Sequence, residues 1–279
     1  MDIPEPNLNP EIAPDQLPAE VQPELFRQPP PVPRTPWRLR DLGFFIAFML
    51  FALLLCSFIT FAGYEILRPV FGWHATLDSL RTNAFFNIAF QCLLYVIVLC
   101  YLYVLVVKYY RLPFWRGLGW QHLPVRRALK FAALGAALSF AIEFAPTLLP
   151  DKSKFPLQEL FSSPSGAYAL ALFAVLIAPP MEEVLFRGML FAYFERWVGL
   201  RFAIGGTALL FAALHIQEYQ GAWNHALLIL VVGLIFSVAR GITGSLAPSI
   251  LLHMSYNATQ MIVLFFVSHH FRAMPGFAG

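Results

Sequence analysis

The sequence predicts an all-α, polytopic membrane protein, a bundle of about seven transmembrane helices around a central polar cavity. Of the 279 residues, 58% are hydrophobic and only 13% are charged, whereas soluble domains carry about 25% charged residues. About seven apolar segments approach the roughly 20 residues that cross a bilayer. One of them contains two adjacent glutamates, and because ionised carboxylates are costly in hydrocarbon, such acids usually face a wet cavity or a partner.

The first element is a tail from Met1 to about Pro36, which holds half of the 22 prolines. Such a segment cannot bury enough apolar area to offset its ordering entropy. We expect a disordered, proline-rich cytoplasmic tail over residues 1–36. Beyond it we divide the chain into N-terminal transmembrane helices (37–164), a core (165–267) and a C-terminal tail (268–279).

The apolar segments that follow give the helices in order. They run over residues 42–66, 84–107, 128–149, 167–196, 202–216, 224–239 and 246–267. The fifth and sixth are short for full spans, which predicts broken or tilted helices around a polar interior.

Basic residues mark alternate connections between these segments. They precede the first span and lie between the second and third, between the fourth and fifth, and after the sixth, where Arg240 stands. The positive-inside rule therefore predicts a cytoplasmic N-terminus. The same rule accounts for the basic excess without nucleic acid, so we expect no nucleic-acid partner. The expected surroundings are the lipid bilayer of the bacterial cytoplasmic membrane.

Three late segments each carry a polar residue with a second candidate residue four positions away, a spacing that places both members of each pair on one face of a helix. With a rise of about 1.5 Å per residue, Glu182, the two histidines and Asn257 lie at a similar depth from the predicted cytoplasmic surface. They can therefore meet in one buried site. The candidate residues are Glu182, Glu183, Arg187, Phe211, His215, His253 and Asn257.

Pro179 and Pro180 stand directly before the acids. A proline pair inside a helix removes backbone donors and forces a break or kink. If a new helix begins there, Glu182 and Glu183 lie in its first turn, where the macrodipole favours negative charge.

The chemistry of these side chains favours hydrolysis. A carboxylate beside histidine and asparagine can deprotonate water as a general base, while imidazole and amide donors stabilise the oxyanion of an attacked carbonyl. That set suffices for amide hydrolysis without a covalent intermediate. Ser249 and Ser255 lie near His253 but are explained as small helix-packing residues.

The three motifs in this order resemble those of the CPBP family, the CAAX proteases and bacteriocin-processing enzymes also called Abi proteins. The motifs are Glu182-Glu183-x-x-x-Arg187, Phe211-x-x-x-His215 and His253-x-x-x-Asn257. The resemblance covers roughly residues 165 to 260 and implies an all-helical intramembrane glutamate protease with a central active-site cavity. It implies that Glu182 is the base that activates water, that Glu183 and Arg187 order it or the substrate, and that His215 supports the water or the base. It also implies that His253 and Asn257 form the oxyanion site. We expect Phe211 to form a wall of the site and not to take part in the reaction.

Several alternatives stay open. Glu183 and Arg187 have the spacing of a structural ion pair, and the whole constellation can instead lock the helices of a non-catalytic membrane scaffold or regulator. A transporter would also need broken helices, but inverted halves are not evident. Two histidines and the glutamates make a conceivable zinc set, yet no short His chelate occurs and Arg187 adds positive charge, so we expect no cofactor. The expected partner is a membrane-associated or lipidated peptide or protein.

Overall fold

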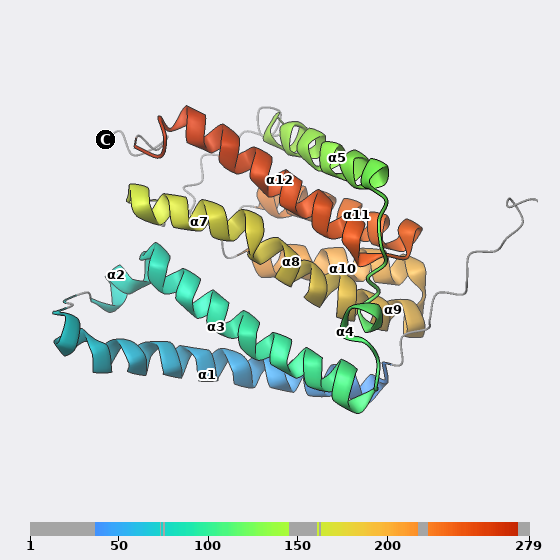
Figure 1. Ribbon diagram of the computed structural model, residues 1–279, viewed down its shortest axis with the longest axis horizontal. Coiled ribbons are helices and arrows are strands. Elements are labelled where there is room, and N and C mark those ends of the chain that lie inside the picture. Colours follow the sequence, from blue (N-terminus) through green and yellow to red (C-terminus); the bar gives the residue numbers. More distant parts are fainter. Residues whose placement is uncertain are drawn as a thin grey trace, which may run out of the picture. The chain divides into compact units, whose positions relative to one another are not determined.

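Every regular element in the described part of the chain is a helix (Figure 1). The computed structural model describes residues 37–72, 74, 76–144, 161, 163–216 and 223–272. The predicted tail 1–36 and residues 273–279 of the predicted C-terminal tail lie outside these ranges. The helices are α1 (Leu39–Phe71), α2 (Leu77–Arg81), α3 (Ala84–Tyr103), α4 (Phe114–Gly117), α5 (Val125–Phe144), α7 (Pro164–Leu176), α8 (Ala178–Glu183), α9 (Phe191–Val198), α10 (Leu200–His215), α11 (Trp223–Thr243) and α12 (Leu246–Val267), with two π-helical stretches, η3 (Val104–Tyr109) and η5 (Val184–Leu190).

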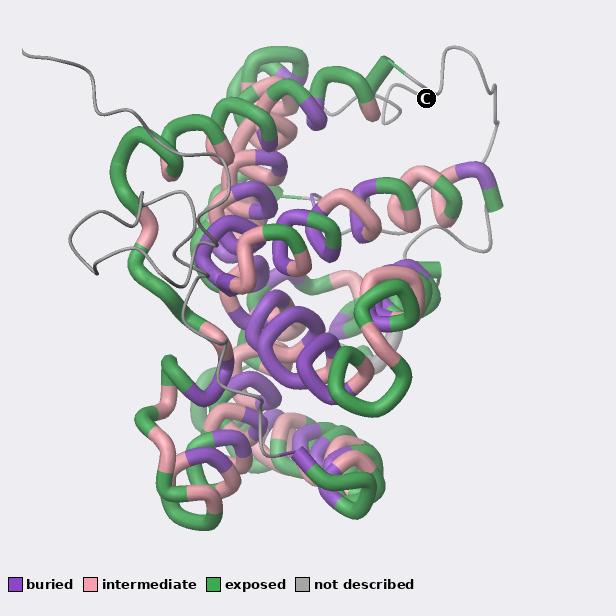
Figure 2. The backbone as a smooth tube through the Cα atoms, turned by 90° about the vertical axis from the view of Figure 1, so that its right-hand side faces the viewer, coloured by how far each residue is buried: buried purple, intermediate pink, exposed green. Residues whose placement is uncertain are grey.

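The helices pack around the segment 164–198, which runs through the middle of the described helices (Figure 1). Helix α1 lies along α3, and α3 packs on α7. On the other side α12 contacts α5, α7, α8 and α11, while α10 packs against α9 and α11. Buried residues gather in this interior, whereas outer helices such as α1 expose most of their apolar side chains (Figure 2).

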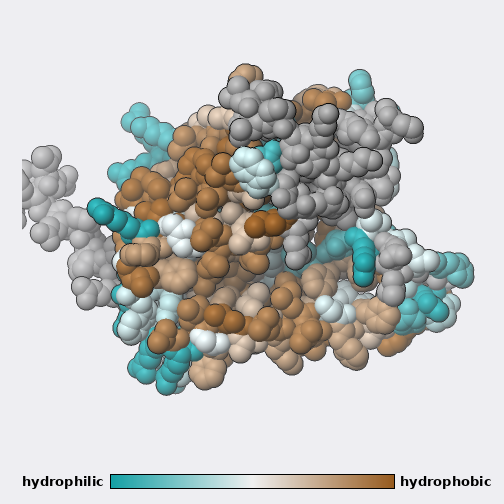
Figure 3. Space-filling model, turned by 180° about the vertical axis from the view of Figure 1, so that it is seen from behind, coloured by the Kyte–Doolittle hydropathy of each residue, from teal (hydrophilic) through white to brown (hydrophobic). Residues whose placement is uncertain are grey.

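Five helices are long and apolar enough to cross a membrane, counted over the described residues. They cover Leu39–Phe71, Ala84–Tyr109, Pro164–Val198, Trp223–Thr243 and Leu246–Val267. Apolar surface forms a broad band across the face in Figure 3, and hydrophilic residues gather toward its two ends. The predicted polytopic helical bundle is confirmed, and the protein is an integral membrane protein.

Two of the seven expected segments are not among these five helices: 202–216, which is α10, and 128–149, which is described as α5 only up to Phe144. The sixth segment is among the five but differs from its predicted length. Helix α10 has 16 residues and is short, as predicted. Helix α11 is not short: it has 21 residues and continues past Arg240 to Thr243. The prediction failed because Arg240 was assigned to a loop at the membrane surface, whereas its side chain is buried against the protein.

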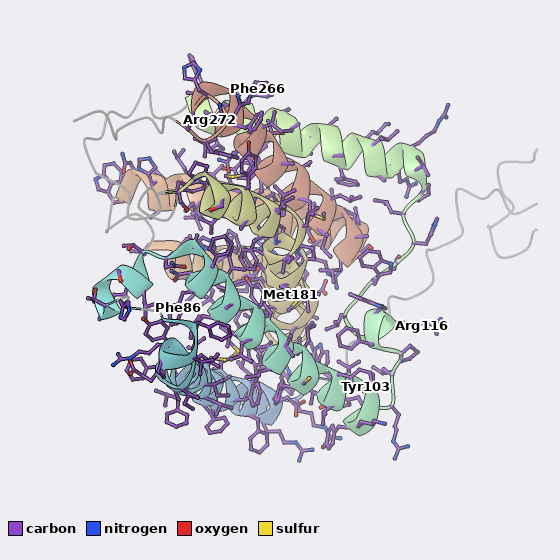
Figure 4. All side chains as sticks on the ribbon, turned by 60° about the vertical axis from the view of Figure 1, so that its left-hand side comes forward. Phe86, Tyr103, Arg116, Met181, Phe266 and Arg272 are labelled. Carbon is purple, nitrogen blue, oxygen red and sulfur yellow. The ribbon has the colours of Figure 1, made fainter. Side chains whose placement is uncertain are left out.

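The ends of the helices alternate as the basic residues predict. The beginnings of α1, α5, α10 and α12 lie at one end of the bundle of described helices, together with the ends of α3, α9 and α11 (Figure 1). Figure 4 shows the same direction along α3, from Phe86 near one end to Tyr103 near the other, where Arg116 also lies. The basic connections therefore share one side, and the cytoplasmic assignment of that side stays a prediction.

The predicted break before the acidic pair occurs at Ile177, between α7 and α8. However, α8 begins at Ala178, ahead of Pro179 and Pro180, and its first turn contains no acid. The prediction that both glutamates lie in the first turn is wrong. Proline is tolerated in the first turn because the amides there lack helical acceptors, so the prolines occupy that turn and move the acids into the next.

Helix α5 meets α12 at a glycine. A Cβ built on Gly135 would lie 2.0 Å from Ser255 Oγ and 2.4 Å from the Leu252 carbonyl oxygen. No other residue fits without moving the α12 backbone, and small residues let helices approach closely in this way. Since Leu252 precedes His253, this contact also fixes the position of the third motif.

Candidate functional site

The centre of the site is a buried ion pair on the segment that follows Pro180. Glu183 and Arg187 are both 0% exposed, and Arg187 Nη1 donates to Glu183 Oε1 at 2.9 Å. They stand four residues apart across the junction of α8 and η5, which brings their side chains to one face. The predicted structural ion pair is present, and it neutralises one of the two adjacent acids.

Arg187 is held by three further groups of α10 and α11. Its Nη2 donates to the Gly233 carbonyl oxygen at 2.9 Å and its Nε donates to Ser237 Oγ at 3.3 Å. The guanidinium also lies over the Phe211 ring, 4.7 Å from its centroid, a position favoured by the ring quadrupole. The planar fork of arginine suits these several fixed acceptors, so Arg187 links the first motif to α10 and α11.

The π-helical turn η5 creates the binding point for a second arginine. The Phe191 N–H bonds to the Phe186 carbonyl, five residues back. The Arg187 carbonyl therefore loses the donor that a regular α-helix would supply. Arg240 Nε donates to that carbonyl at 3.1 Å, and its guanidinium lies 5.2 Å from the Phe191 ring centroid. The hydrogen bond from Arg240 thus stabilises the backbone that carries the ion pair.

Glu182 occupies a different environment from its neighbour. Its side chain is 20% exposed, and its two oxygens have separate partners. The Tyr95 hydroxyl donates to Oε1 at 3.4 Å, and His253 Nε2 lies 3.8 Å from Oε2. Of the two acids, Glu182 is therefore the one that is accessible and lacks an arginine partner in the described residues.

His253 lies between the two acids. Its Nδ1 is 3.0 Å from Glu183 Oε1, while Nε2 faces Glu182. Because a carboxylate only accepts hydrogen bonds, Nδ1 carries the proton that Glu183 receives when both acids are ionised. The His253 side chain is 6% exposed. His253 thereby joins the third motif to the first.

Phe211 separates the two histidines. Its ring centroid lies 4.4 Å from that of His215 and 5.7 Å from that of His253. His215 Nδ1 lies 2.7 Å from the Phe211 carbonyl oxygen. A carbonyl cannot donate, so Nδ1 carries the proton and the neutral ring presents an accepting Nε2. The prediction that Phe211 forms a wall fits this geometry.

Asn257 contacts a different part of the fold. Its Nδ2 donates to the Ala174 carbonyl oxygen at 2.8 Å. Ala174 lies in the last turn of α7, where backbone carbonyls lack helical donors. Asn257 therefore stabilises the end of α7 at the break. Its predicted place in the oxyanion site stays a prediction.

Two further members of the site were not singled out from the sequence, and a third was assigned to the membrane surface. Tyr95 and Ser237 lie in apolar runs, Arg240 was taken as a surface cation, and each joins the site through a contact between distant residues. Within the described ranges, no group of three or more His, Cys, Asp or Glu side chains is arranged to hold a metal ion.

Comparison with known proteins agrees with the resemblance for part of the chain. Residues 164–259 match the family model described as type II CAAX prenyl endopeptidase Rce1-like, so the predicted resemblance to CAAX proteases is confirmed for that segment. An uncharacterized 24.3 kDa protein of Escherichia coli is 39% identical over 139 residues, which cover 47% of this chain and 56% of that protein. No solved structure matches at a significant level.

Proposed function

We propose that the protein is an intramembrane endopeptidase that hydrolyses an amide bond with water activated by Glu182. The observation that carries this proposal is the unequal state of the two adjacent acids. Glu183 is fully buried and paired with Arg187, whereas Glu182 is partly exposed beside His253 and Tyr95. Two acids in contrasting environments are the arrangement that separates a reactive carboxylate from a supporting one.

In the proposed reaction each of these residues has a role. Glu182 takes a proton from water, and the hydroxide attacks the carbonyl carbon of the substrate amide. The accepting Nε2 of His215 orients the water. The second amide proton of Asn257 stabilises the oxyanion, joined by Nε2–H of His253 when that ring carries a proton on both nitrogens. Glu182 then returns its proton to the nitrogen as the C–N bond breaks, so a carboxyl and an amine leave.

The supporting acid has a separate task in this scheme. Glu183 binds the Nδ1 proton of His253 while Arg187 balances its charge. This fixes the imidazole without leaving an uncompensated charge in the interior, which would be very costly. We assign Glu183 and Arg187 to positioning and Glu182 to the chemistry.

The surroundings of the site and the matched family model support the substrate class that we propose. The site lies among helices whose outer faces are apolar, and the model describes prenyl endopeptidases. We propose a membrane-associated or lipid-bearing peptide, met in a bacterial cytoplasmic membrane with the N-terminus of this chain on the cytoplasmic side.

The test uses purified full-length protein in liposomes. It is given a farnesylated peptide that ends in a CAAX sequence and the same peptide without the lipid, and products are identified by mass spectrometry. The proposal expects cleavage of the lipidated peptide and its loss in Glu182→Gln. If neither lipidated peptides nor membrane peptides from a proteomic comparison are cleaved, the proposal is wrong.

The buried network itself favours a second candidate, a non-catalytic scaffold or regulator. Arg187 alone ties Glu183, Gly233 and Ser237 together, and such a network locks helices whether or not chemistry occurs. A Glu182→Gln protein that rescues a deletion phenotype as well as the native chain would favour this candidate.

A further inference from the structure

Tyr95 reaches the candidate base from a helix that carries none of the three motifs. It lies on α3, outside the segment 164–259 that matches the family model. Its hydroxyl donates to Glu182 Oε1 at 3.4 Å across 87 positions of the sequence. Helix α3 packs on α7, directly before the break that presents Glu182.

The ring of Tyr95 is held firmly, so its hydroxyl has a defined place. The residue is 7% exposed and stacks on Phe173 with an interplanar angle of 7°. Ala178 and Met181 complete this apolar cluster on both sides of the break. A buried tyrosine normally finds a partner for its hydroxyl, and here that partner is the accessible acid.

The two neighbours of Glu182 lie beside different oxygens. Tyr95 donates to Oε1 from α3, while His253 faces Oε2 from α12. The hydrogen bond from Tyr95 orients the carboxylate plane, and a base must lie within hydrogen-bond reach of the proton that it removes. A separation of 3.4 Å is at the long end for a hydrogen bond in a free enzyme, and such bonds tighten in the substrate complex.

We propose that Tyr95 is a positioning residue for Glu182, so that α3 contributes to the reaction through the orientation of the base. This inference rests on the proposed function. It also extends the functional unit beyond residues 165–267, because the helix that completes the surroundings of the base comes from the N-terminal half.

The first experiment removes only the hydroxyl. Tyr95→Phe keeps the ring and its stacking on Phe173, and Tyr101→Phe, on the same helix but stacked on Phe48, is the matched control. We expect Tyr95→Phe to lower kcat about tenfold, the size of one hydrogen bond to a charged group. KM and Tm should stay near the native values, and Tyr101→Phe should leave kcat unchanged.

A second variant separates positioning from packing. Glu182→Asp withdraws the carboxylate from the hydroxyl, so adding Tyr95→Phe to it should cause no further loss, because coupled residues are not additive. A purely structural residue would lower kcat again in that background. The inference is overturned by native kcat in Tyr95→Phe, by a loss that follows Tm, or by additive losses in the double variant.

The two proposals fail in different ways. If the native protein cleaves no peptide, the proposed function is wrong. If the native protein cleaves, Glu182→Gln does not and Tyr95→Phe is fully active, the function stands and only the role of Tyr95 is wrong.

Discussion

Replacing Arg187 with methionine tests whether the buried ion pair holds the site together. The substitution leaves Glu183 charged at 0% exposure and removes the donors to Gly233 and Ser237. Breaking a buried pair from one side costs about 3–5 kcal/mol. Since about 1 kcal/mol moves the Tm of a chain of this size by roughly 2–4 °C, we expect Tm to fall by roughly 6–20 °C.

The assay is thermal unfolding in detergent, followed by a thiol-reactive dye that detects exposure of the buried Cys56 in a chain whose Cys92 and Cys100 are replaced by alanine. Adding Glu183→Gln removes the stranded charge and should restore about 2 kcal/mol of the loss. The control is Arg68→Met, which breaks the exposed pair with Glu65 and should cost less than about 1 kcal/mol. Equal losses in Arg187→Met and Arg68→Met, with no recovery in the double variant, would refute the reasoning.

Three further predictions concern packing, pH and metal. Gly135→Ala should lower Tm by at least 5 °C in the same assay, roughly the cost of overpacking, because its Cβ would meet the Leu252 carbonyl at 2.4 Å; an unchanged Tm would contradict the close approach. Burial and the hydrogen bond to Asp41 raise the pKa of Tyr110 from about 10 to about 12. The folded state therefore holds this proton more tightly, and the stabilisation is present below pH 10 and lost toward pH 12. Tyr110→Phe should flatten the fall in Tm over that range, and curves of Tm against pH that run parallel for the variant and the native protein would count against this prediction. Exhaustive chelation should leave peptidase activity intact, because Arg187 already neutralises Glu183; activity lost and then restored by zinc would reverse that expectation.

The helices and the faces that carry the motifs could be predicted because their signals are local. Apolar length and the four-residue helical spacing are properties of each segment alone. They located the helices around Glu182, His215 and His253 and placed these residues at a similar depth. The contacts of His253 with Glu183 and Phe211 agree with that reasoning.

Other features depend on contacts between distant parts of the chain and leave no local pattern. Arg240 was predicted to be a surface cation, yet its side chain is buried, where it donates to the Arg187 carbonyl that lacks a helical donor in η5. Tyr95 lies in a purely apolar run, and only the packing of α3 on α7 brings it to Glu182. Both cases show tertiary structure overriding a local signal, as expected at a functional site.

The proposed role of Glu182 is tested most directly by the kinetics of Glu182→Gln, which keeps the volume of the side chain and removes its basicity. The control is Glu143→Gln, an exposed acid on α5. We predict that kcat/KM on the lipidated peptide falls at least about 100-fold in Glu182→Gln, with native Tm and with native activity in the control. Peptide cleavage by Glu182→Gln at the native rate would contradict the assignment of Glu182 as the base.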